Sequence, residues 1–393
     1  MTMEQTAPRR ADASQPWRAR VLHLLYSTDR SGVGLWLLDL LPYLQQAGFG
    51  VDVVTLRRNP GTLDEEFLRA GVRVTHIGTA RRYRQFAARF RQIIETDGPY
   101  QIVHSSLPYG GIQLRLAARH GIPVRIAHSH ADMRPLEAQQ SLKRRLLNGL
   151  ERHLVARYAT TRLAVSPPAA EGLFDASWQA NGACILLPCG RDYSAYARPV
   201  DRAAVRRSLG LADAPLVIGH AGRLTWQKNH ALLFRITAEV LRREPRARLL
   251  LVGEGELRYE LQADAQALGI DRSIVFAGDR ADIPELMLGA MDVFVFPSHY
   301  EGLSLAVVEA QAAGLPCVLA DHLTDRAIVL PELVRRLPLS APVEAWATAI
   351  IDLALGAALE REVALARVLA SDLAIEPHAA KMTAIYEAVL GHA

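Results

Sequence analysis

The chain has 393 residues, of which 50% are hydrophobic and 22% charged, so it is long enough for two globular domains and too apolar for a disordered protein. Its 45 basic and 41 acidic residues leave a formal net charge of +4, which argues against a nucleic-acid-binding protein. The three cysteines, Cys184, Cys189 and Cys317, are too few for a disulfide framework and lack the spacing of a metal site, which indicates a reducing compartment.

The N-terminal residues 1–19 are polar and lack the apolar stretch of a secretory signal, so we expect a flexible tail there. No uncharged apolar run approaches the roughly 18 to 20 residues of a membrane span. Asp39 and Pro42 interrupt the longest candidate, residues 35–44. We therefore expect a cytoplasmic protein that is soluble or peripheral to a membrane.

From residue 20 to about residue 195, short apolar segments alternate with helical patterns. The expected strands are 20–26, 51–56, 72–77, 102–104, 124–127, 162–165 and 185–187. This alternation predicts an α/β domain with a doubly wound parallel sheet covered on both faces. Between its first strand and first helix, Gly32 and Gly34 would let the backbone approach a ligand, although a tight turn explains them equally well.

The same pattern restarts after a polar stretch at about 190–214. The expected strands of the second half are 216–221, 249–252, 274–277, 293–296 and 318–319. We therefore expect a first doubly wound domain at 20–195 and a second at 196–375. Ligands of such sheets bind beyond the carboxyl ends of the strands, so two facing domains would share one cleft.

The segment 297–313 follows a buried strand and enters a helix, and it carries two glutamates. Glu301 lies just before the expected helix and Glu309 about two turns inside it, so a helical rise separates them by roughly 12 Å, the length of a nucleotide-sugar. The free N–H groups at the helix start, which suit a diphosphate, belong to Gly302, Leu303 and Ser304. Glu309 has apolar neighbours and would need a hydrogen-bonding partner. A pair of solvated glutamates is the alternative.

A second segment, 221–230, follows the first strand of the second domain and carries Arg223 and Lys228. Arginine offers a planar fork to phosphate oxygens, and lysine offers a mobile point charge. Together they would neutralise a leaving diphosphate, although a basic pair on a surface loop is also common.

These two segments resemble the nucleotide-sugar domain of GT-B glycosyltransferases of the group 1 kind, glycosyltransferase family four. Glu301 and Glu309 match the family's Glu-x7-Glu motif, and the residues around them, 296–303 and 307–318, resemble the exopolysaccharide and capsule branch. Residues 250–257 and 275–283 are similar to the family's strand and base-contact loop. The resemblance spans roughly residues 20–350 and is stronger in the second half.

This resemblance implies a GT-B fold of two Rossmann-like domains that face each other across a cleft, with a C-terminal helix at 376–393 packing back toward the first domain. It implies a retaining transferase in which Arg223 and Lys228 bind the diphosphate. Glu309 would hold the ribose, and Glu301 would contact the donor sugar.

The resemblance also implies that the nucleotide base contacts the backbone of Gly278, Asp279 and Arg280. No metal or other cofactor is expected, because protein cations stabilise the leaving diphosphate. The spacing of Asp279 and Asp282 differs from that of a DxD metal-binding pair.

In the first half, His128 and His130 follow the strand at 124–127. The family often has a histidine here that lines the donor sugar; His128 matches it best, and His130 is the alternate. The glycine turn at 31–36 lacks the acidic residue of the family's Gly-Gly-x-Glu pattern. At the domain junction the chain reads Pro-Cys-Gly-Arg-Asp, where the family has Pro-Asn-Gly-Ile-Asp. We interpret Cys189 there as a small turn residue, because no base is placed beside it.

Residues 143–158 read as a basic amphipathic helix, with five apolar residues on one face: Leu146, Leu147, Leu150, Leu154 and Val155. Such a helix either rests on the inner face of an anionic membrane or packs on the core with a solvated basic face. Both interpretations stay open.

We therefore expect transfer of a hexose or amino-hexose from a nucleotide-diphosphate sugar, in this family most often a UDP-sugar, to a lipid-linked glycan acceptor of exopolysaccharide or capsule biosynthesis. The expected catalytic residues are Glu301, His128, Arg223 and Lys228. A transferase with a soluble acceptor, a sugar-nucleotide epimerase of the same fold and a catalytically silent nucleotide-sugar-binding protein are the alternatives.

Overall fold

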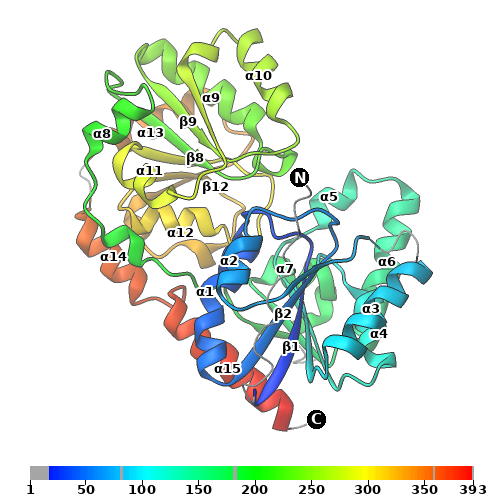
Figure 1. Ribbon diagram of the computed structural model, residues 1–393. Helices are drawn as coiled ribbons and strands as arrows, with labels where there is room; N and C mark the ends of the chain where they lie inside the picture. Colours follow the sequence, from blue (N-terminus) through cyan, green and yellow to red (C-terminus); the bar gives the residue numbers. More distant parts are fainter. Residues whose placement is uncertain (1–16, 80–82, 180–183, 357–358, 392–393) are drawn as a thin grey trace, which may run out of the picture.

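The computed structural model describes residues 17–79, 83–179, 184–356 and 359–391, so the expected tail at 1–19 lies almost wholly outside the described residues. Two α/β domains make up this part of the chain (Figure 1). The first contains a seven-stranded sheet in the order β3-β2-β1-β4-β5-β6-β7, and the second a six-stranded sheet in the order β10-β9-β8-β11-β12-β13. All strand pairs are parallel, which confirms the predicted doubly wound fold.

The first domain alternates strands and helices from β1 to β7. Its elements are β1 (Ala19–Leu25), α1 (Gly32–Gln46), β2 (Phe49–Thr55), α2 (Asp64–Arg69), β3 (Val74–His76), α3 (Tyr83–Asp97), β4 (Ile102–Ser105), α4 (Gly111–Arg119), β5 (Val124–Ser129), α5 (Arg134–Ala138), α6 (Leu142–Tyr158), β6 (Thr161–Ala164), α7 (Pro167–Phe174) and β7 (Cys184–Leu186). All seven residues of β2 are buried, as expected for a strand covered on both faces.

The second domain repeats this alternation and ends in three helices. Its elements are α8 (Arg202–Ser208), β8 (Val217–Ala221), α9 (His230–Arg243), β9 (Arg248–Val252), α10 (Arg258–Ala267), β10 (Ile274–Gly278), α11 (Ile283–Gly289), β11 (Val293–Phe296), α12 (Leu305–Ala312), β12 (Cys317–Ala320), β13 (Val334–Leu337), α13 (Val343–Leu355), α14 (Arg361–Leu369) and α15 (Ile375–Gly391). The edge strand β13 was not predicted from the sequence.

Each sheet reverses its strand order next to its first strand. In the first domain β1 pairs with β2 on one side and β4 on the other, and in the second β8 pairs with β9 and β11. The loops that leave two neighbouring strands at such a point diverge to opposite faces of the sheet and leave a crevice between them. The loops after β8 and β11 are those that carry the predicted site residues.

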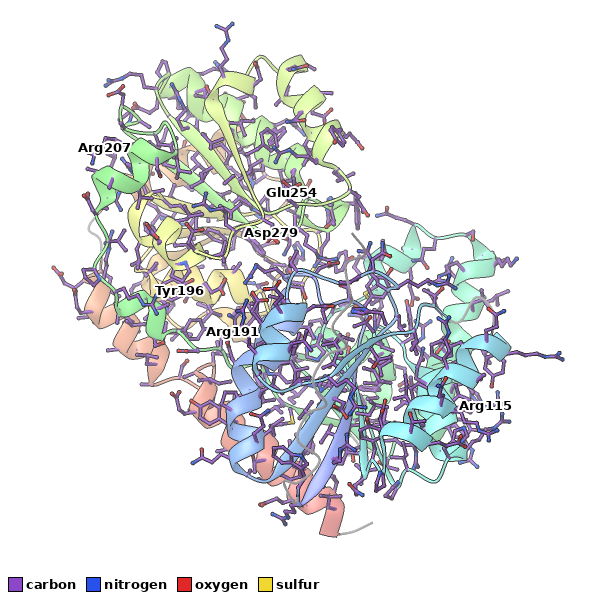
Figure 2. All side chains as sticks on the ribbon, viewed as in Figure 1. Arg115, Arg191, Tyr196, Arg207, Glu254 and Asp279 are labelled. Atoms are coloured by element: carbon purple, nitrogen blue, oxygen red, sulfur yellow. The ribbon has the colours of Figure 1, made fainter. Side chains whose placement is uncertain are left out.

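The chain crosses between the domains twice, and the two crossings lie side by side. The first follows β7 and runs from Arg191, where the domains meet, past Tyr196 to α8 (Figure 2). The second precedes α15, which runs along α1 of the first domain (Figure 1). The N–H of Arg191 donates to the carbonyl oxygen of Leu373 at 2.9 Å, and Arg191 forms a parallel β-bridge with Ala374.

Helix α15 is held to the first domain by buried polar contacts. The indole Nε1 of Trp36 on α1 donates to Nε2 of His378 at 2.7 Å, and Nδ1 of His378 lies 2.8 Å from the carbonyl oxygen of Pro188. The Tyr386 hydroxyl hydrogen-bonds with Nδ1 of His104 at 2.7 Å.

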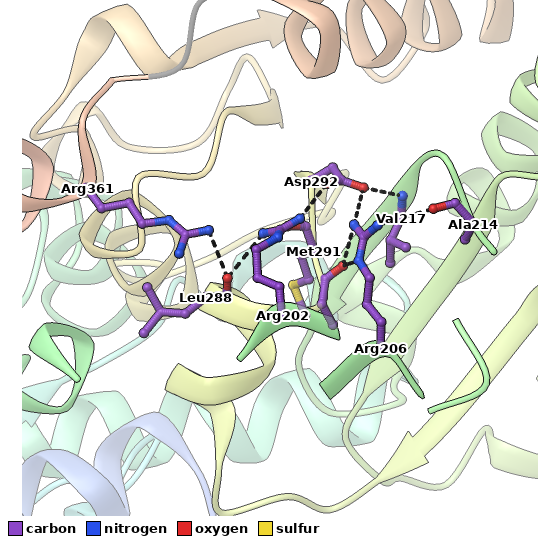
Figure 3. A network of polar contacts seen from close by, with 9 residues as sticks. Arg202, Arg206, Ala214, Val217, Leu288, Met291, Asp292 and Arg361 are labelled. Atoms are coloured by element: carbon purple, nitrogen blue, oxygen red, sulfur yellow. Dashed lines mark hydrogen bonds and ion pairs between the residues drawn. The ribbon is translucent and has the colours of Figure 1, made fainter. Parts of the chain in front are cut away.

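Helix α8 is fastened to the second sheet by an arginine network (Figure 3). Asp292, just before β11, accepts from Arg202 at 2.8 Å and from Arg206 at 2.6 Å. The same carboxylate accepts from the N–H of Val217 at 2.8 Å, which joins the network to the start of β8. The network lies away from the strand ends that carry the predicted site.

None of the helices in the described ranges is long and apolar enough to cross a membrane.

Candidate functional site

Three hydrogen bonds to backbone carbonyl oxygens join the loops after β8 and β11. The N–H of His299 donates to the carbonyl oxygen of Gln227 at 2.8 Å. The Gln227 side chain donates to the carbonyl oxygen of Tyr300 at 3.0 Å, and the Asn229 side chain to that of Pro297 at 3.0 Å. These bonds hold the loop that carries Arg223 and Lys228 against the loop that carries Glu301.

Lys228 and Glu301 form a direct ion pair. Nζ of Lys228 lies 2.7 Å from Oε1 of Glu301, and only 13% of the lysine and 8% of the glutamate side chain are exposed. The ammonium also lies 4.4 Å from the centre of the Phe296 ring. The sequence indicated the two residues separately, and the structure brings them together.

Arg223 is the other cation of this site, and its guanidinium makes no hydrogen bond or ion pair with any residue that the structure describes. Its side chain is exposed and near enough to Tyr300 to lower the pKa of that phenol, against a larger rise caused by burial of the phenol. An anion would therefore meet a guanidinium whose donors are all available.

Helix α12 begins later than the sequence indicated. Ser304 adopts a left-handed conformation, with φ of 60°, and the helix starts at Leu305 rather than near Leu303. Glu309 therefore lies little more than one turn inside the helix, and helical rise does not describe its separation from Glu301. The predicted anion-binding N–H groups precede the helix instead of forming its first turn.

Unpaired polar groups gather at this helix start. The N–H groups of Gly302, Leu303 and Ser304 donate to no acceptor among the described residues, although Leu303 and Ser304 are buried. The hydroxyl oxygens of Ser304 and Ser298 are also buried and have no hydrogen-bonding partner in the described ranges. Buried polar groups are paired in nearly all folded proteins, so unpaired donors at one place indicate a ligand with several acceptors.

Glu309 is buried and paired with an arginine that the sequence did not indicate. NH1 of Arg191, from the first crossing, lies 3.3 Å from Oε1 of Glu309, and Nε of Arg191 donates to Asp39 on α1. Burial raises the pKa of the Glu309 carboxyl and Arg191 opposes this rise. The sequence signal was the arginine that replaces isoleucine in the junction motif.

The predicted base-contact loop follows β10. Gly278 has a φ of 76°, in the left-handed region that favours glycine. Arg280 is paired with Asp282, its Nε donating to Oδ1 at 2.7 Å. Burial raises the pKa of the Asp279 carboxyl, and Arg30 of the first domain acts against that rise. This loop therefore lies close to the first domain.

The two domains touch at glycines. A Cβ atom on Gly302 would lie 1.8 Å from the carbonyl oxygen of His130, and one on Gly32 would lie 3.2 Å from Cδ1 of Leu305. Gly34 is buried in the first turn of α1, where its N–H donates to the Ser31 side chain at 3.3 Å. Gly32 thus lies next to the start of α12, whereas the Gly34 N–H donates to the Ser31 side chain that caps α1.

His128 and His130 belong to a buried cluster. His128 is fully buried beside Trp36, with a ring separation of 5.4 Å, and its Nδ1 lies 3.1 Å from Nε2 of His104. Nε2 of His130 lies 3.0 Å from the Ser106 hydroxyl. Burial lowers the pKa of His128, and it lowers that of His130 to about 3, so both rings are neutral at pH 7. The backbone of His130, not that of His128, adjoins Gly302.

Cys189 does have a histidine beside it. Its Sγ lies 3.5 Å from Nδ1 of His130. Burial raises the pKa of the thiol and lowers that of the imidazole, so the pair is a neutral thiol next to a neutral ring. This arrangement supplies no thiolate nucleophile.

Helix α6 divides its apolar residues between core and solvent. Leu154 and Val155 are buried, but the first half of the helix exposes four leucines: Leu142 (71%), Leu146 (68%), Leu147 (47%) and Leu150 (54%). Lys143, Arg144 and Arg145 lie beside them and are also exposed. The first half of α6 is therefore an exposed surface that is both apolar and basic.

Within the described ranges, no group of three or more His, Cys, Asp or Glu side chains is arranged to hold a metal ion.

Family models match both halves of the chain. Residues 31–190 match the glycosyl transferase 4-like domain, and residues 201–363 match the glycosyl transferases group 1. The putative glycosyltransferase EpsF of Bacillus subtilis is 34% identical over 348 residues, which cover 87% of this chain and 90% of that protein.

A second relative is the UDP-Gal:alpha-D-GlcNAc-diphosphoundecaprenol alpha-1,3-galactosyltransferase of Escherichia coli, which is 27% identical over 318 residues, or 77% of this chain and 80% of that one. Among solved structures, Anabaena HepE in complex with UDP and glucose is similar with a TM-score of 0.75 at 20% identity, covering 94% of this chain and 99% of that chain. WaaG, from lipopolysaccharide biosynthesis, is similar with a TM-score of 0.70 at 16% identity, covering 93% and 99%.

Proposed function

The chain belongs to the group 1 glycosyltransferases of GT-B fold, and from this premise we propose that it moves a hexose or amino-hexose from a UDP-sugar to a lipid-linked glycan acceptor, with retention of the anomeric configuration. The acceptor would belong to exopolysaccharide or capsule assembly. The donor would bind between the two domains, at the carboxyl ends of β8 and β11.

The unpaired donors at the start of α12 carry this proposal. No described residue accepts from the Arg223 guanidinium or from the N–H groups of Gly302, Leu303 and Ser304. A diphosphate, with its many acceptor oxygens and negative charge, satisfies all of them at once. A neutral ligand would offer no opposite charge to the Arg223 guanidinium.

The remaining roles follow from this placement of the diphosphate. Arg223 and Lys228 stabilise the charge that develops on the leaving diphosphate, which is the part that a metal ion plays in other transferases. Glu301 holds Lys228 in place and contacts the donor sugar. Glu309 accepts hydrogen bonds from the ribose hydroxyls.

The base and the sugar would meet different domains. The backbone of Gly278, Asp279 and Arg280 contacts the base on the second domain. Of the two histidines of the first domain, His130 adjoins the donor loop through its backbone, whereas His128 is enclosed behind it. We assign His128 the role of supporting that wall of the cleft.

The donor and acceptor classes rest on the relatives. HepE was crystallised with UDP and glucose, and the Escherichia coli enzyme is named for a UDP-galactose donor and a diphosphoundecaprenol-linked acceptor. EpsF, the relative with 34% identity, extends over most of both chains.

The exposed surface of α6 suits a lipid-linked acceptor, because exposed leucines beside cations match an anionic bilayer. We expect the protein to sediment with anionic liposomes and not with zwitterionic ones. Replacing Leu146 and Leu150 by glutamine, or Lys143, Arg144 and Arg145 by glutamate, should abolish sedimentation. If neither set of substitutions alters sedimentation, membrane docking through α6 is contradicted and a soluble acceptor is favoured.

Calorimetric titration with UDP tests the donor site. We expect Glu309→Ala to abolish binding, and Arg223→Met to weaken it by about tenfold or more, since a charge-assisted hydrogen bond contributes about 1.5–3 kcal/mol. Unchanged affinity in both variants would overturn the site assignment.

Turnover tests the reaction class. A screen of nucleotide-sugars with membrane extract as the acceptor should release nucleoside diphosphate only when extract is present. An isomerised sugar-nucleotide without acceptor dependence would instead identify an epimerase, and binding without turnover a silent binding protein.

A further inference from the structure

Arg191 occupies the place where three parts of the chain meet. It comes from the crossing after β7, its Nε donates to Asp39 on α1, and its NH1 lies 3.3 Å from Oε1 of Glu309 on α12. Its side chain is only 11% exposed, and those of Asp39 and Glu309 are 20% and 16% exposed. Figure 2 shows Arg191 at the boundary between the domains.

The backbone of this arginine is held independently of its side chain. Its N–H donates to the carbonyl oxygen of Leu373 at 2.9 Å, and the N–H of Asp192 donates to Asp39 at 3.1 Å. Gly190 is packed so closely that a Cβ would lie 2.4 Å from the carbonyl oxygen of Ala374. The guanidinium therefore starts from a rigid point and spans the two carboxylates.

We propose that Arg191 is a positioning residue that holds the Glu309 carboxylate ionised and oriented for the ribose hydroxyls of the donor, and that anchors it to the first domain through Asp39. This inference rests on the proposed function of Glu309. It assigns to Arg191 a part in donor binding without contact to the donor.

The geometry leaves Glu309 free to take this part. Arg191 contacts Oε1, and Oε2 has no hydrogen-bonding partner among the described residues. An arginine fork can pair with one carboxylate through Nε and another through NH1 in a fixed geometry, whereas a lysine ammonium is a mobile point charge with no fixed donor directions. One oxygen is thus fixed by the protein while the other remains available to the ribose.

The charge balance around Glu309 depends on Arg191. Asp39 acts in the opposite direction, since its negative charge raises the pKa of the Glu309 carboxyl, as burial does. Burial raises the pKa of both Tyr193 and Tyr196, which face the same group and are neutral. Arg191 is the cation among the described neighbours that keeps Glu309 charged.

The inference predicts opposite pH effects for the two partners of this ion-pair chain. We expect UDP binding by the wild-type protein to be lost as the pH falls through the range where Glu309 takes up a proton. Arg191→Met should move this loss to higher pH and weaken binding at pH 7 by about tenfold, because it removes the cation. Asp39→Asn should move the loss to lower pH, because it removes the competing anion.

Calorimetric titration of the full-length protein with UDP from pH 8.5 to pH 5.5 measures these shifts. Arg206→Met is the matched control, because Arg206 is also part-buried and paired with a carboxylate, 2.6 Å from Asp292, but lies outside the site. Its binding curve should follow that of the wild type. Thermal unfolding of every variant at each pH establishes that the titrated protein is folded.

Arg191→Lys keeps the test decisive where Arg191→Met does not fold. Lysine retains one charge but not the fork, so its pH profile should lie between those of the wild type and Arg191→Met. A folded Arg191→Met or Arg191→Lys protein with the wild-type pH profile would overturn the inference and leave the proposed function standing. A wild-type protein that does not bind UDP would overturn the proposed function and this inference together.

Discussion

The Lys228 side chain is closely surrounded by its neighbours. Its ammonium lies between the Glu301 carboxylate at 2.7 Å and the Phe296 ring at 4.4 Å, and its stem passes so close to Gly222 that a Cβ there would be 2.9 Å from Cε. The planar guanidinium of arginine is wider than an ammonium and demands different hydrogen-bond directions. Charge alone therefore does not define what this position requires.

We expect Lys228→Arg to lower turnover by about tenfold or more, although it conserves charge, because the guanidinium cannot occupy the Lys228 position without moving Glu301. Lys143→Arg, on the exposed surface of α6, is the control and should leave turnover unchanged. Release of nucleoside diphosphate under saturating donor measures both. Equal turnover in the two variants would contradict the confinement described above.

At the residue scale, the sequence could indicate single site residues, but it could not indicate contacts between residues that are far apart in the chain. Arg223, Lys228 and Glu301 could each be indicated by the short loop that carries them, because each loop follows an apolar strand; the contact between Lys228 and Glu301 could not. Arg191 and Asp39 are 152 positions apart in the chain, and Arg191 and Glu309 are 118 positions apart and come from different domains. No local pattern contains that information.

Among the elements, the loop before α12 shows how closely the domains approach. Gly302 has no space for a side chain, because the carbonyl oxygen of His130 occupies the position that a Cβ would take. The glycine was predicted as a donor-binding residue for its N–H group. The structure adds that its missing side chain allows the first domain to reach the donor loop.

We therefore expect Gly302→Ala to hold the domains apart and lower turnover by about 100-fold, because an error of about 1 Å in position is costly in catalysis. The free energy of unfolding should change little. Gly149→Ala on α6 is the matched control, since a Cβ there meets nothing within 4 Å. Turnover measured at saturating donor, together with chemical unfolding, distinguishes misplacement from instability, and an active Gly302→Ala enzyme would contradict it.

The elements that were predicted incompletely share a physical cause. Periodicity predicted α6 as an amphipathic helix, but it could not show that only the C-terminal half of the apolar face is covered by the first domain. Strand β13 reads Val-Arg-Arg-Leu and lies at the edge of its sheet, so it has neither an apolar run nor a clean alternation. Complete burial produces the apolar runs that predicted the central strands, but α6 and β13 are only partly buried.

At the scale of the whole molecule, buried histidines make stability depend on pH: burial lowers the pKa of His220 and of His230 in the second domain, and that of a further five. Burial lowers the pKa of His23 and His130 to about 3 and that of His378 to about 4, and it lowers those of His104 and His128. All five lie in the first domain or on α15, which packs against it. Unfolded histidines titrate near 6.5, so below that pH the unfolded state binds more protons than the folded state.

The free energy of unfolding should consequently fall as the pH is lowered from 7 to 5.5, by up to about 1.4 kcal/mol per pH unit for each such histidine. Urea unfolding at several pH values measures the slope. His23→Gln should reduce it, whereas His153→Gln, which alters an exposed histidine on α6, should not. A slope of zero would show that these rings take up protons equally in the folded and unfolded states, and it would contradict the lowered pKa values.

The paired crossings also determine how the cleft can open. A single connecting segment would let one domain rotate in any direction relative to the other. Here the two crossings run side by side and are hydrogen-bonded to each other through Arg191, Leu373 and Ala374. We therefore expect the cleft to open mainly by rotation about an axis along the two crossings. Donor entry and product release would then use the same opening. Residues near the crossings, such as Arg191, would move least when the domains rotate.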